Sequence, residues 1–348
     1  MAQELALICP GPESPRLSAL LASALRGRPV QRISWVTDGL KDRRLLVAAA
    51  IPPSGVNLEL YQLLAFLRTH PGCLAGSVGG VVVDGGGDLY TKAAGRELVL
   101  SASHAGCVFP GRPLVEATGT LRNFTVQARN AGCDLAEAYR LAVADLADRV
   151  SGFVPPLRQR PHLLVLHASS RATSNTLALW SRVRAHLEDR CDITEVGLRN
   201  GTMEDCAGCP YTTCLHFGEQ GDCFYGGVMV REVYPAVREA DAVVLLCPNY
   251  NDALSANLSA CINRLTALYR TTSFADKAVF AIVVSGYSGG DIVARQVVSA
   301  LNMNKGFWLP AEFCMLETAN DRGEAMALPG IGARAEKFAI NILRQLAV

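Results

Sequence analysis

Short apolar runs recur in the same order in both halves of the chain, and this repetition constrains the fold more than any other feature. The runs are rich in Val, Leu, Ile and Ala, as is typical of parallel strands that helices cover on both faces. Between them lie segments with helical spacing, such as 175–187 and 255–269. The runs are residues 4–8, 44–49 and 80–84 in the first half and 162–167, 242–247 and 278–284 in the second. This alternation of strand and helix predicts a doubly wound α/β fold in each half.

The two halves also match residue by residue, which indicates an internal duplication. Three stretches pair at offsets near 200, whereas the first strands pair at an offset near 158, Leu5 with Leu163. The second half therefore carries about forty extra residues between its first and middle strands. Chance resemblance between two unrelated α/β domains is the alternative. The paired stretches are Asn57-Leu58 with Asn257-Leu258, Arg96 to Val99 with Arg295 to Val298, and Gly106 to Pro110 with Gly306 to Pro310.

The length of 348 residues also favours two domains, because one hydrophobic core rarely extends that far. The boundary is expected near residues 151–156, where two prolines are followed by Arg158 and Arg160. We therefore predict a domain at 1–155 and another at 156–348, with a cysteine-rich insertion at about 202–230. Both domains are expected to be parallel sheets between two helical layers.

Composition narrows the classes of partner. Hydrophobic residues make up 50% of the chain, charged residues 19%, and the formal net charge is +1. This balance differs from that of a disordered tail and gives no support to a nucleic-acid or membrane partner. The first residues lack a basic segment followed by an apolar stretch, and no apolar run approaches the ~20 residues that span a bilayer. We expect a cytoplasmic protein.

The segment 168–176 is the strongest chemical signal, because it collects hydroxyl and amide side chains between a predicted strand and a predicted helix. A helix N-terminus offers unpaired N–H groups and partial positive charge, so these side chains suit a phosphate. Arg171 can add a charge-assisted contact. The alternative is an ordinary helix cap at Ser174 or Asn175. Neither a Walker A loop nor a Rossmann GxGxxG pattern fits this segment.

Two more loops follow the next two predicted strands, Cys247 to Asp252 and Ser285 to Asp291. Ligands of open parallel sheets bind at the carboxyl ends of strands, so all three loops are expected to form one site. In the first of these two loops, an aromatic residue stands between amides, and the second is glycine-rich, which lets backbone N–H groups approach a flat heterocycle. Taken separately, each loop is equally well explained as a turn or a flexible connection.

At these residues the sequence resembles the NADPH-dependent FMN reductase branch of the flavodoxin-like superfamily, over roughly residues 161–315. The resemblance implies that the first loop holds the FMN phosphate and that the other two line the isoalloxazine ring. It implies electron transfer from NAD(P)H through FMN, and no acid–base residue is required. The matching residues are Ser169, Arg171, Ser174, Asn175 and Thr176 in the first loop, Pro248, Asn249, Tyr250 and Asn251 in the second, and Ser285, Gly286, Tyr287, Gly289 and Gly290 in the third.

The first half departs from this pattern, because prolines in Cys9 to Pro15 replace the donors of a phosphate loop. We expect no second FMN there. Because such reductases commonly dimerise near the flavin, either a homodimer or an internal pseudo-dimer is expected. The electron acceptor, a small molecule or a protein, is not identified. The alternative functions are a non-enzymatic electron carrier and a binding module that has lost its flavin.

Four of the twelve cysteines crowd into the predicted insertion, namely Cys206, Cys209, Cys214 and Cys223. In a reducing compartment such crowding indicates metal or redox chemistry. The segment resembles iron–sulfur flavoproteins, although their cysteines are more tightly spaced. A [4Fe-4S] cluster, a structural zinc, and free thiols or a reversible disulfide all remain open. His216 is expected to face solvent, and most of the other cysteines are expected to be buried thiols.

Overall fold

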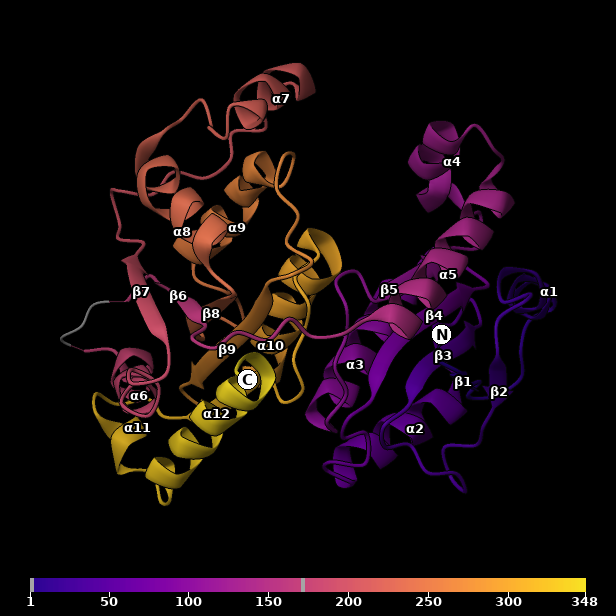
Figure 1. Ribbon diagram of the computed structural model, residues 1–348, viewed down its shortest axis with the longest axis horizontal. Helices are drawn as coiled ribbons and strands as arrows, with labels where there is room; N and C mark the ends of the chain where they lie inside the picture. Colours follow the sequence, from indigo (N-terminus) through magenta and orange to yellow (C-terminus); the bar gives the residue numbers. More distant parts are fainter. Residues whose placement is uncertain (1–2, 170–172) are drawn as a thin grey trace. The chain divides into compact units, whose positions relative to one another are not determined.

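A computed structural model describes residues 3–169 and 173–348 of the chain. Two compact units divide between Val154 and Pro155, and each contains one five-stranded sheet (Figure 1). Arg171 lies outside the described residues. Among the described residues, none of the helices combines the length and the apolar character needed to cross a membrane.

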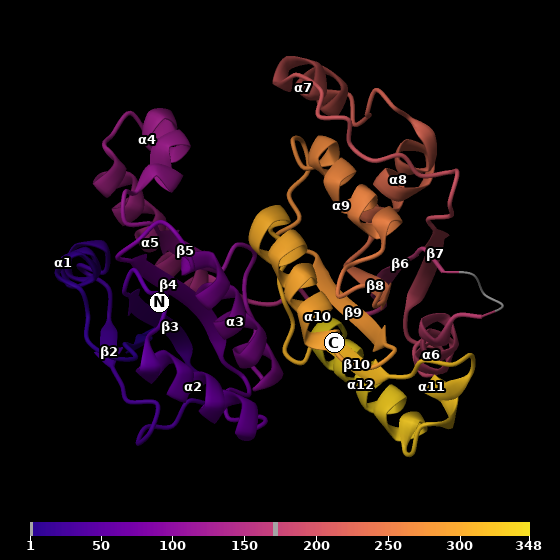
Figure 2. The same ribbon diagram turned by 180° about the vertical axis from the view of Figure 1, so that it is seen from behind.

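The first unit is a parallel sheet in the order β2-β1-β3-β4-β5. Its strands are β1 (Leu5–Ile8), β2 (Val30–Arg32), β3 (Arg44–Ile51), β4 (Val78–Gly85) and β5 (Leu114–Ala117). Its helices are α1 (Pro15–Ala24), α2 (Leu58–Thr69), α3 (Thr91–His104), α4 (Thr125–Ala131) and α5 (Leu135–Gly152), with a 3-10 turn η1 (Arg122–Phe124). Helix α1 packs with α5 and α2 packs with α3 (Figure 2). Leu46 and Val82 join the core cluster with α1 and α5, whereas their neighbours Leu45 and Val81 lie among α2 and α3 residues, so helices cover both faces.

The second unit is a parallel sheet in the order β10-β9-β8-β6-β7. Its strands are β6 (His162–His167), β7 (Asp192–Gly197), β8 (Ala242–Pro248), β9 (Ala278–Ser285) and β10 (Cys314–Thr318). Its α-helices are α6 (Asn175–Arg184), α7 (Tyr211–Glu219), α8 (Tyr234–Glu239), α9 (Ala256–Leu268), α10 (Gly290–Val297), α11 (Glu324–Ala327) and α12 (Ile331–Leu346). Two π-helical segments, η2 (Met229–Val233) and η3 (Val298–Lys305), precede α8 and follow α10. Helix α6 packs with α11 and α12, whereas α7 and η3 pack against α9.

Both sheets have the flavodoxin-like strand order, in which the first strand lies between the second and the third. This confirms the predicted fold class, and the two similar sheets fit a tandem duplication. The six predicted strands are all present, with ends that differ by at most two residues. The predicted helices at 175–187 and 255–269 are α6 and α9.

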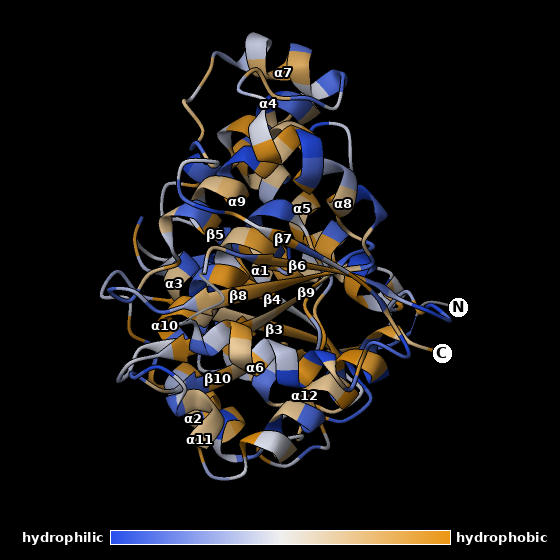
Figure 3. Ribbon diagram, turned by 90° about the vertical axis from the view of Figure 1, so that its left-hand side faces the viewer, coloured by the Kyte–Doolittle hydropathy of each residue, from blue (hydrophilic) through white to orange (hydrophobic). Residues whose placement is uncertain are grey.

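The central strands form because most of their residues are apolar and gain free energy when they are buried. Every residue of β4 and of β9 is buried, and Figure 3 colours the strands as mainly hydrophobic, between helices that carry both hydrophobic and hydrophilic residues. Full burial of a Val, Leu or Ile side chain contributes about 1.5–3 kcal/mol, which fixes these strands at the centre of each sheet. Polar residues therefore collect where the strands end.

Candidate functional site

The three predicted loops of the second unit follow β6, β8 and β9, which are neighbours in the sheet. Their carboxyl ends lie at the same edge because all the strands are parallel. Asn249 links the last two loops directly. Its backbone N–H donates to the Val284 carbonyl at 2.9 Å, and its amide Nδ2 lies 3.2 Å from Ser285 Oγ and 3.0 Å from the Ser288 carbonyl.

The loop after β6 ends in a chain of hydroxyl groups at the N-terminus of α6. Ser174 is the helix cap, and its Oγ accepts a hydrogen bond from the Leu177 N–H at 3.2 Å. The same Oγ lies 2.7 Å from Thr176 Oγ1, which in turn lies 3.5 Å from Ser169 Oγ. Three hydroxyls thus meet where a helix presents unpaired N–H groups and partial positive charge, a combination that suits an anion.

Asn175 has a different role from its neighbours. Its Nδ2 donates to the Asp321 carbonyl at 2.9 Å, and its Oδ1 accepts from the Gly323 N–H at 3.0 Å. Both ends of the amide are therefore used to tie the start of α6 to the connection between β10 and α11. The side chain positions the loop, and the sequence pattern gave no sign of this contact.

The loop after β8 leaves one buried acceptor open. Asn249 Oδ1 is buried and has no hydrogen-bond partner among the described residues. A buried polar atom left in this state costs roughly 1–3 kcal/mol, so a ligand N–H that reached it would be favoured. Tyr250 and Tyr287, from the two linked loops, are 61% and 82% exposed and offer aromatic surface at this edge.

Glycine is required in the third loop because another loop comes too close. Gly289 has φ +84°, and a Cβ there would lie 2.0 Å from Asp252 Oδ1. At Gly286 a Cβ would lie 2.9 Å from Asn320 Oδ1. The glycines thus let the loops after β8, β9 and β10 approach one another, as an assembled site requires.

A separate cavity of about 890 Å³ borders the first loop at Ser169 and extends along the end of β7. His167 and Arg199 lie beside Gly197, where a Cβ would be 3.3 Å from His167 Cε1 and 3.9 Å from Arg199 Nε. Arg231 also lines this cavity. The sequence did not predict this cavity, because no pattern identified β7, which supplies part of its wall.

The four clustered cysteines line one pocket of about 150 Å³. However, the described residues include no group of three or more His, Cys, Asp or Glu side chains placed to hold a metal ion. The pocket is fixed to α9, where Arg264 is 3% exposed and donates to the Gly226 carbonyl at 2.7 Å. Desolvation raises the pKa of Tyr225, and the neighbouring Cys209 raises this pKa further. His216 is exposed and does not line this pocket.

Residues 161–321 match the family model of the NADPH-dependent FMN reductases, and the match lies entirely within the second unit. This confirms the predicted resemblance of the second half and supports an NAD(P)H-dependent flavin oxidoreductase. The match does not extend to the first unit. No curated protein matches the chain in sequence.

Several solved structures are weakly similar to this chain. One is RosB with bound 8-demethyl-8-formylriboflavin-5'-phosphate, at 13% identity and a TM-score of 0.42, covering 53% of this chain and 78% of that one. Another is an NAD(P)H:quinone oxidoreductase from Methanothermobacter marburgensis, at 15% identity and 0.37, covering 53% and 94%. A third is an FMN-dependent NADH-azoreductase from Bacillus anthracis with FMN, at 13% identity and 0.37, covering 54% and 100%.

Proposed function

We propose that the second unit binds FMN at the edge formed by its three loops and passes electrons from NAD(P)H through the flavin to an acceptor. The observation that supports this proposal most directly is that two features lie at the ends of adjacent strands. These features are the linked hydroxyl groups at the start of α6 and the Asn249 Oδ1 acceptor, which has no partner among the described residues. The family match over residues 161–321 supports the same activity.

In this proposal Ser169, Ser174 and Thr176 donate hydrogen bonds to the FMN phosphate, together with the N–H groups of α6 and with Arg171. Their hydroxyls are already gathered, so little ordering is needed on binding. Asn175 holds the loop through Asp321 and Gly323.

The ring would lie along the other two loops. Pro248 and Asn251 shape the turn, Asn249 Oδ1 accepts from a ring N–H, and Tyr250 and Tyr287 cover the ring. Ser285, Gly286, Gly289 and Gly290 keep the third loop close. Bound FMN supplies hydride acceptance and release, and the chain supplies position and exclusion of water.

Two measurements test the proposal. Purified protein saturated with FMN should retain the flavin through gel filtration and should oxidise NADPH or NADH in the presence of a quinone. If flavin is retained without steady-state oxidation of either nucleotide, the protein is an electron carrier. If no flavin is retained, the proposed site is wrong.

We also propose that the first unit is a degenerate copy of the second. The identical strand order supports this, and so do the serine caps of the first helices, Ser14 of α1 and Ser174 of α6. Each serine accepts from the N–H three residues later, at Leu17 and Leu177. Such agreement in a local detail favours common descent over chance.

A separate proposal concerns the four clustered cysteines. A [4Fe-4S] cluster held by Cys206, Cys209, Cys214 and Cys223 is supported by their shared pocket, but their described arrangement does not suit a metal ion. We therefore assign no electron-transfer step to a metal. Anaerobic purification with iron and sulfide analysis decides the matter, since a cluster would give about four iron atoms per chain and would be lost in Cys214→Ser.

A further inference from the structure

The first unit has a cavity of about 770 Å³ at the carboxyl edge of its sheet. Its walls come from the segments that follow β1, β3, β4 and β5. It therefore occupies the position in the first unit that corresponds to the proposed FMN site in the second. The volume is typical of a small-molecule site.

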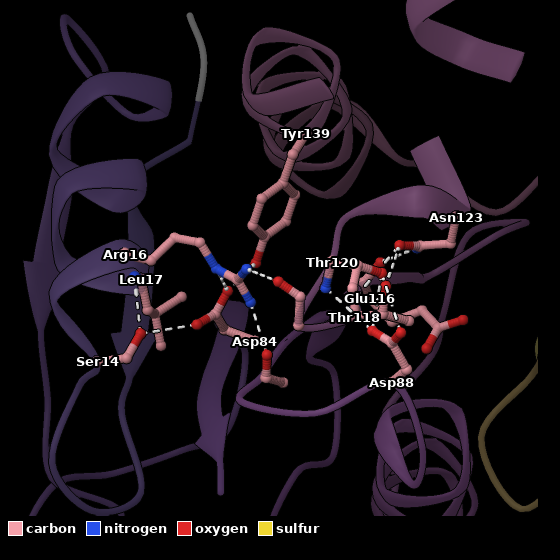
Figure 4. Close-up of polar contacts among 12 residues, drawn as sticks. Ser14, Arg16, Leu17, Asp84, Asp88, Glu116, Thr118, Thr120, Asn123 and Tyr139 are labelled. Carbon is pink, nitrogen blue, oxygen red and sulfur yellow. Dashed lines mark hydrogen bonds and ion pairs between the residues drawn. The ribbon is translucent and has the colours of Figure 1, made fainter. Parts of the chain in front are cut away.

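The end of this cavity that would receive a phosphate already holds a carboxylate. Asp84, 3% exposed, accepts from Arg16 Nε at 2.8 Å and from Ser14 Oγ at 2.7 Å (Figure 4). Arg16 also donates to the carbonyls of Gly119 and Gly85, at 3.0 and 2.7 Å. The Arg16–Asp84 ion pair thus already occupies the α1 N-terminus, and an added phosphate would have to displace the Asp84 carboxylate from the guanidinium.

The helix itself also offers few donors to an outside anion. Pro15 is its first residue and has no N–H, and the Leu17 N–H is used by Ser14 Oγ at 3.0 Å. Arg16 carries the cationic charge that could attract a phosphate, but its guanidinium already donates hydrogen bonds to Asp84 and to two backbone carbonyls. The site has therefore lost the chemistry for anions while keeping its space.

The rest of the cavity is apolar, with two carboxylates at its edge. The apolar side chains include Ile51, Val56 and Leu58. Two further carboxylates face it: Glu13 forms an ion pair with Arg32, and Glu59 Oε2 lies 3.0 Å from the point that a Cβ on Gly11 would occupy. Such a lining favours a ring compound that is uncharged or carries one positive charge.

A residue beside the cavity wall has a strained backbone conformation. Tyr90 caps α3 with φ +72°, which side-chain-bearing residues rarely adopt, whereas the corresponding cap of α10 is Gly289. The Tyr90 ring packs on Gly55, where a Cβ would lie 2.6 Å from it. The ring thereby supports the segment that leads into Val56 and Leu58, and strain of this kind is typical of binding sites.

We propose that this cavity binds an uncharged or singly cationic ring compound without a phosphate group, at a site distinct from the FMN site of the second unit. The proposal does not depend on flavin binding. Its defining property is discrimination against phosphate, which follows from the Arg16–Asp84 ion pair at the start of α1.

Matched probes test this discrimination. The full-length protein, saturated with FMN so that the second unit is filled, is titrated by calorimetry with 1-naphthol, 1-naphthylmethylamine and 1-naphthyl phosphate. The alcohol and the amine should bind at least about 10-fold more tightly than the phosphate ester. Equal binding of the phosphate ester, or no binding of any probe, would overturn the proposal.

Two leucine variants locate the site. Leu58 and Leu89 are each 68% exposed, but only Leu58 lines the cavity. Leu58→Asp should weaken 1-naphthol binding by about 10-fold or more, and Leu89→Asp should leave it unchanged. If both variants behave alike, the probe binds elsewhere. If the protein does not bind FMN but the two leucine variants still differ in 1-naphthol binding, the proposed function is wrong and the proposed cavity site stands.

Discussion

The two units have the same strand order and a serine cap on the first helix, yet the N-termini of these helices differ in their charged and polar side chains. Two residues after the cap, the first unit has Arg16 and the second has Thr176. The next-to-last residue of the facing strand is Asp84 in β4 and Val284 in β9. An ion pair thus fills the helix N-terminus of one unit, and hydroxyl groups leave it open to an anion in the other. We therefore expect the second unit to bind a phosphate at this position and the first unit to exclude it, because the side chains at these two positions differ.

The largest effect is expected from Arg16→Thr, which gives the first unit the residue type of the second. Asp84 would remain buried, and Ser14 and Tyr139 would be its remaining hydrogen-bond donors among the described residues. Loss of one partner of a buried pair costs about 3–5 kcal/mol, and partial exposure of Arg16 reduces this to about 2–3 kcal/mol. Urea unfolding followed by hydrogen-exchange mass spectrometry would report the first unit separately, and FMN content should not change.

A second substitution sharpens that result. Adding Asp84→Val places the residue of β9 in β4 and removes the unpaired carboxylate. Replacing a buried ion pair by apolar side chains is often neutral, so the double variant should recover at least half of the lost free energy of unfolding. Equal stability of Arg16→Thr and the unmodified protein would show that the ion pair does not hold the first unit together.

A smaller effect is expected at the helix caps that follow β4 and β9. Gly289→Ala places a Cβ against Asp252 at φ +84°, so the second and third loops must separate. The dissociation constant of FMN should rise roughly 30-fold, or about 2 kcal/mol. Tyr90→Gly, at the corresponding cap, should leave FMN affinity unchanged in a fluorescence titration. An equal loss in both variants would contradict the assignment of FMN to the second unit.

The two serine caps give a closer comparison. Ser174→Ala and Ser14→Ala each remove a cap worth about 1 kcal/mol of stability, and Ser14→Ala also removes a donor to Asp84. Only Ser174→Ala removes a proposed phosphate donor, so FMN affinity should fall about 10-fold in that variant alone. Flavin fluorescence quenching measures both. A Ser174→Ala protein with unchanged affinity would mean that the serine is merely a cap.

The smallest effect concerns pH. The hydrogen bond from Arg32 holds the pKa of Glu13 below its ordinary value of 4.5. Because the folded-state pKa is depressed, this stabilisation is present above pH 4.5 and is lost as the pH falls through the folded-state pKa. The loss should be about 0.5 kcal/mol in the first unit. Arg32→Ala should abolish this part of the acid sensitivity, which urea unfolding at several pH values would show.

The sequence was sufficient to predict the central strands, because β4 and β9 are buried throughout and are apolar or glycine up to the polar residues near their carboxyl ends, Asp84 and Ser285. It did not identify the edge strands β2, β5, β7 and β10, since these are short or partly exposed and carry mixed residues, as Val30–Arg32 does. An edge strand needs apolar residues on fewer of its faces, so its pattern is weaker.

The loops of the site were predictable because each follows a recognisable strand, but their internal contacts were not. Arg16 and Asp84 are 68 residues apart, and the sequence showed only that prolines replace donors near Ser14. Likewise, the sequence predicts that Asn175 helps to bind the phosphate, but it gave no sign that the amide also donates to a backbone carbonyl 146 residues away. Such pairs are decided by how the chain packs, and no local pattern encodes them.

The number of flavins bound per chain tests the central claim most directly. The full-length protein is saturated with FMN, freed of excess ligand by gel filtration, and assayed for flavin absorbance against amino-acid analysis. Because the ion pair blocks one helix N-terminus and the other is open, one FMN per chain is expected. Two FMN per chain, or none, would contradict the account.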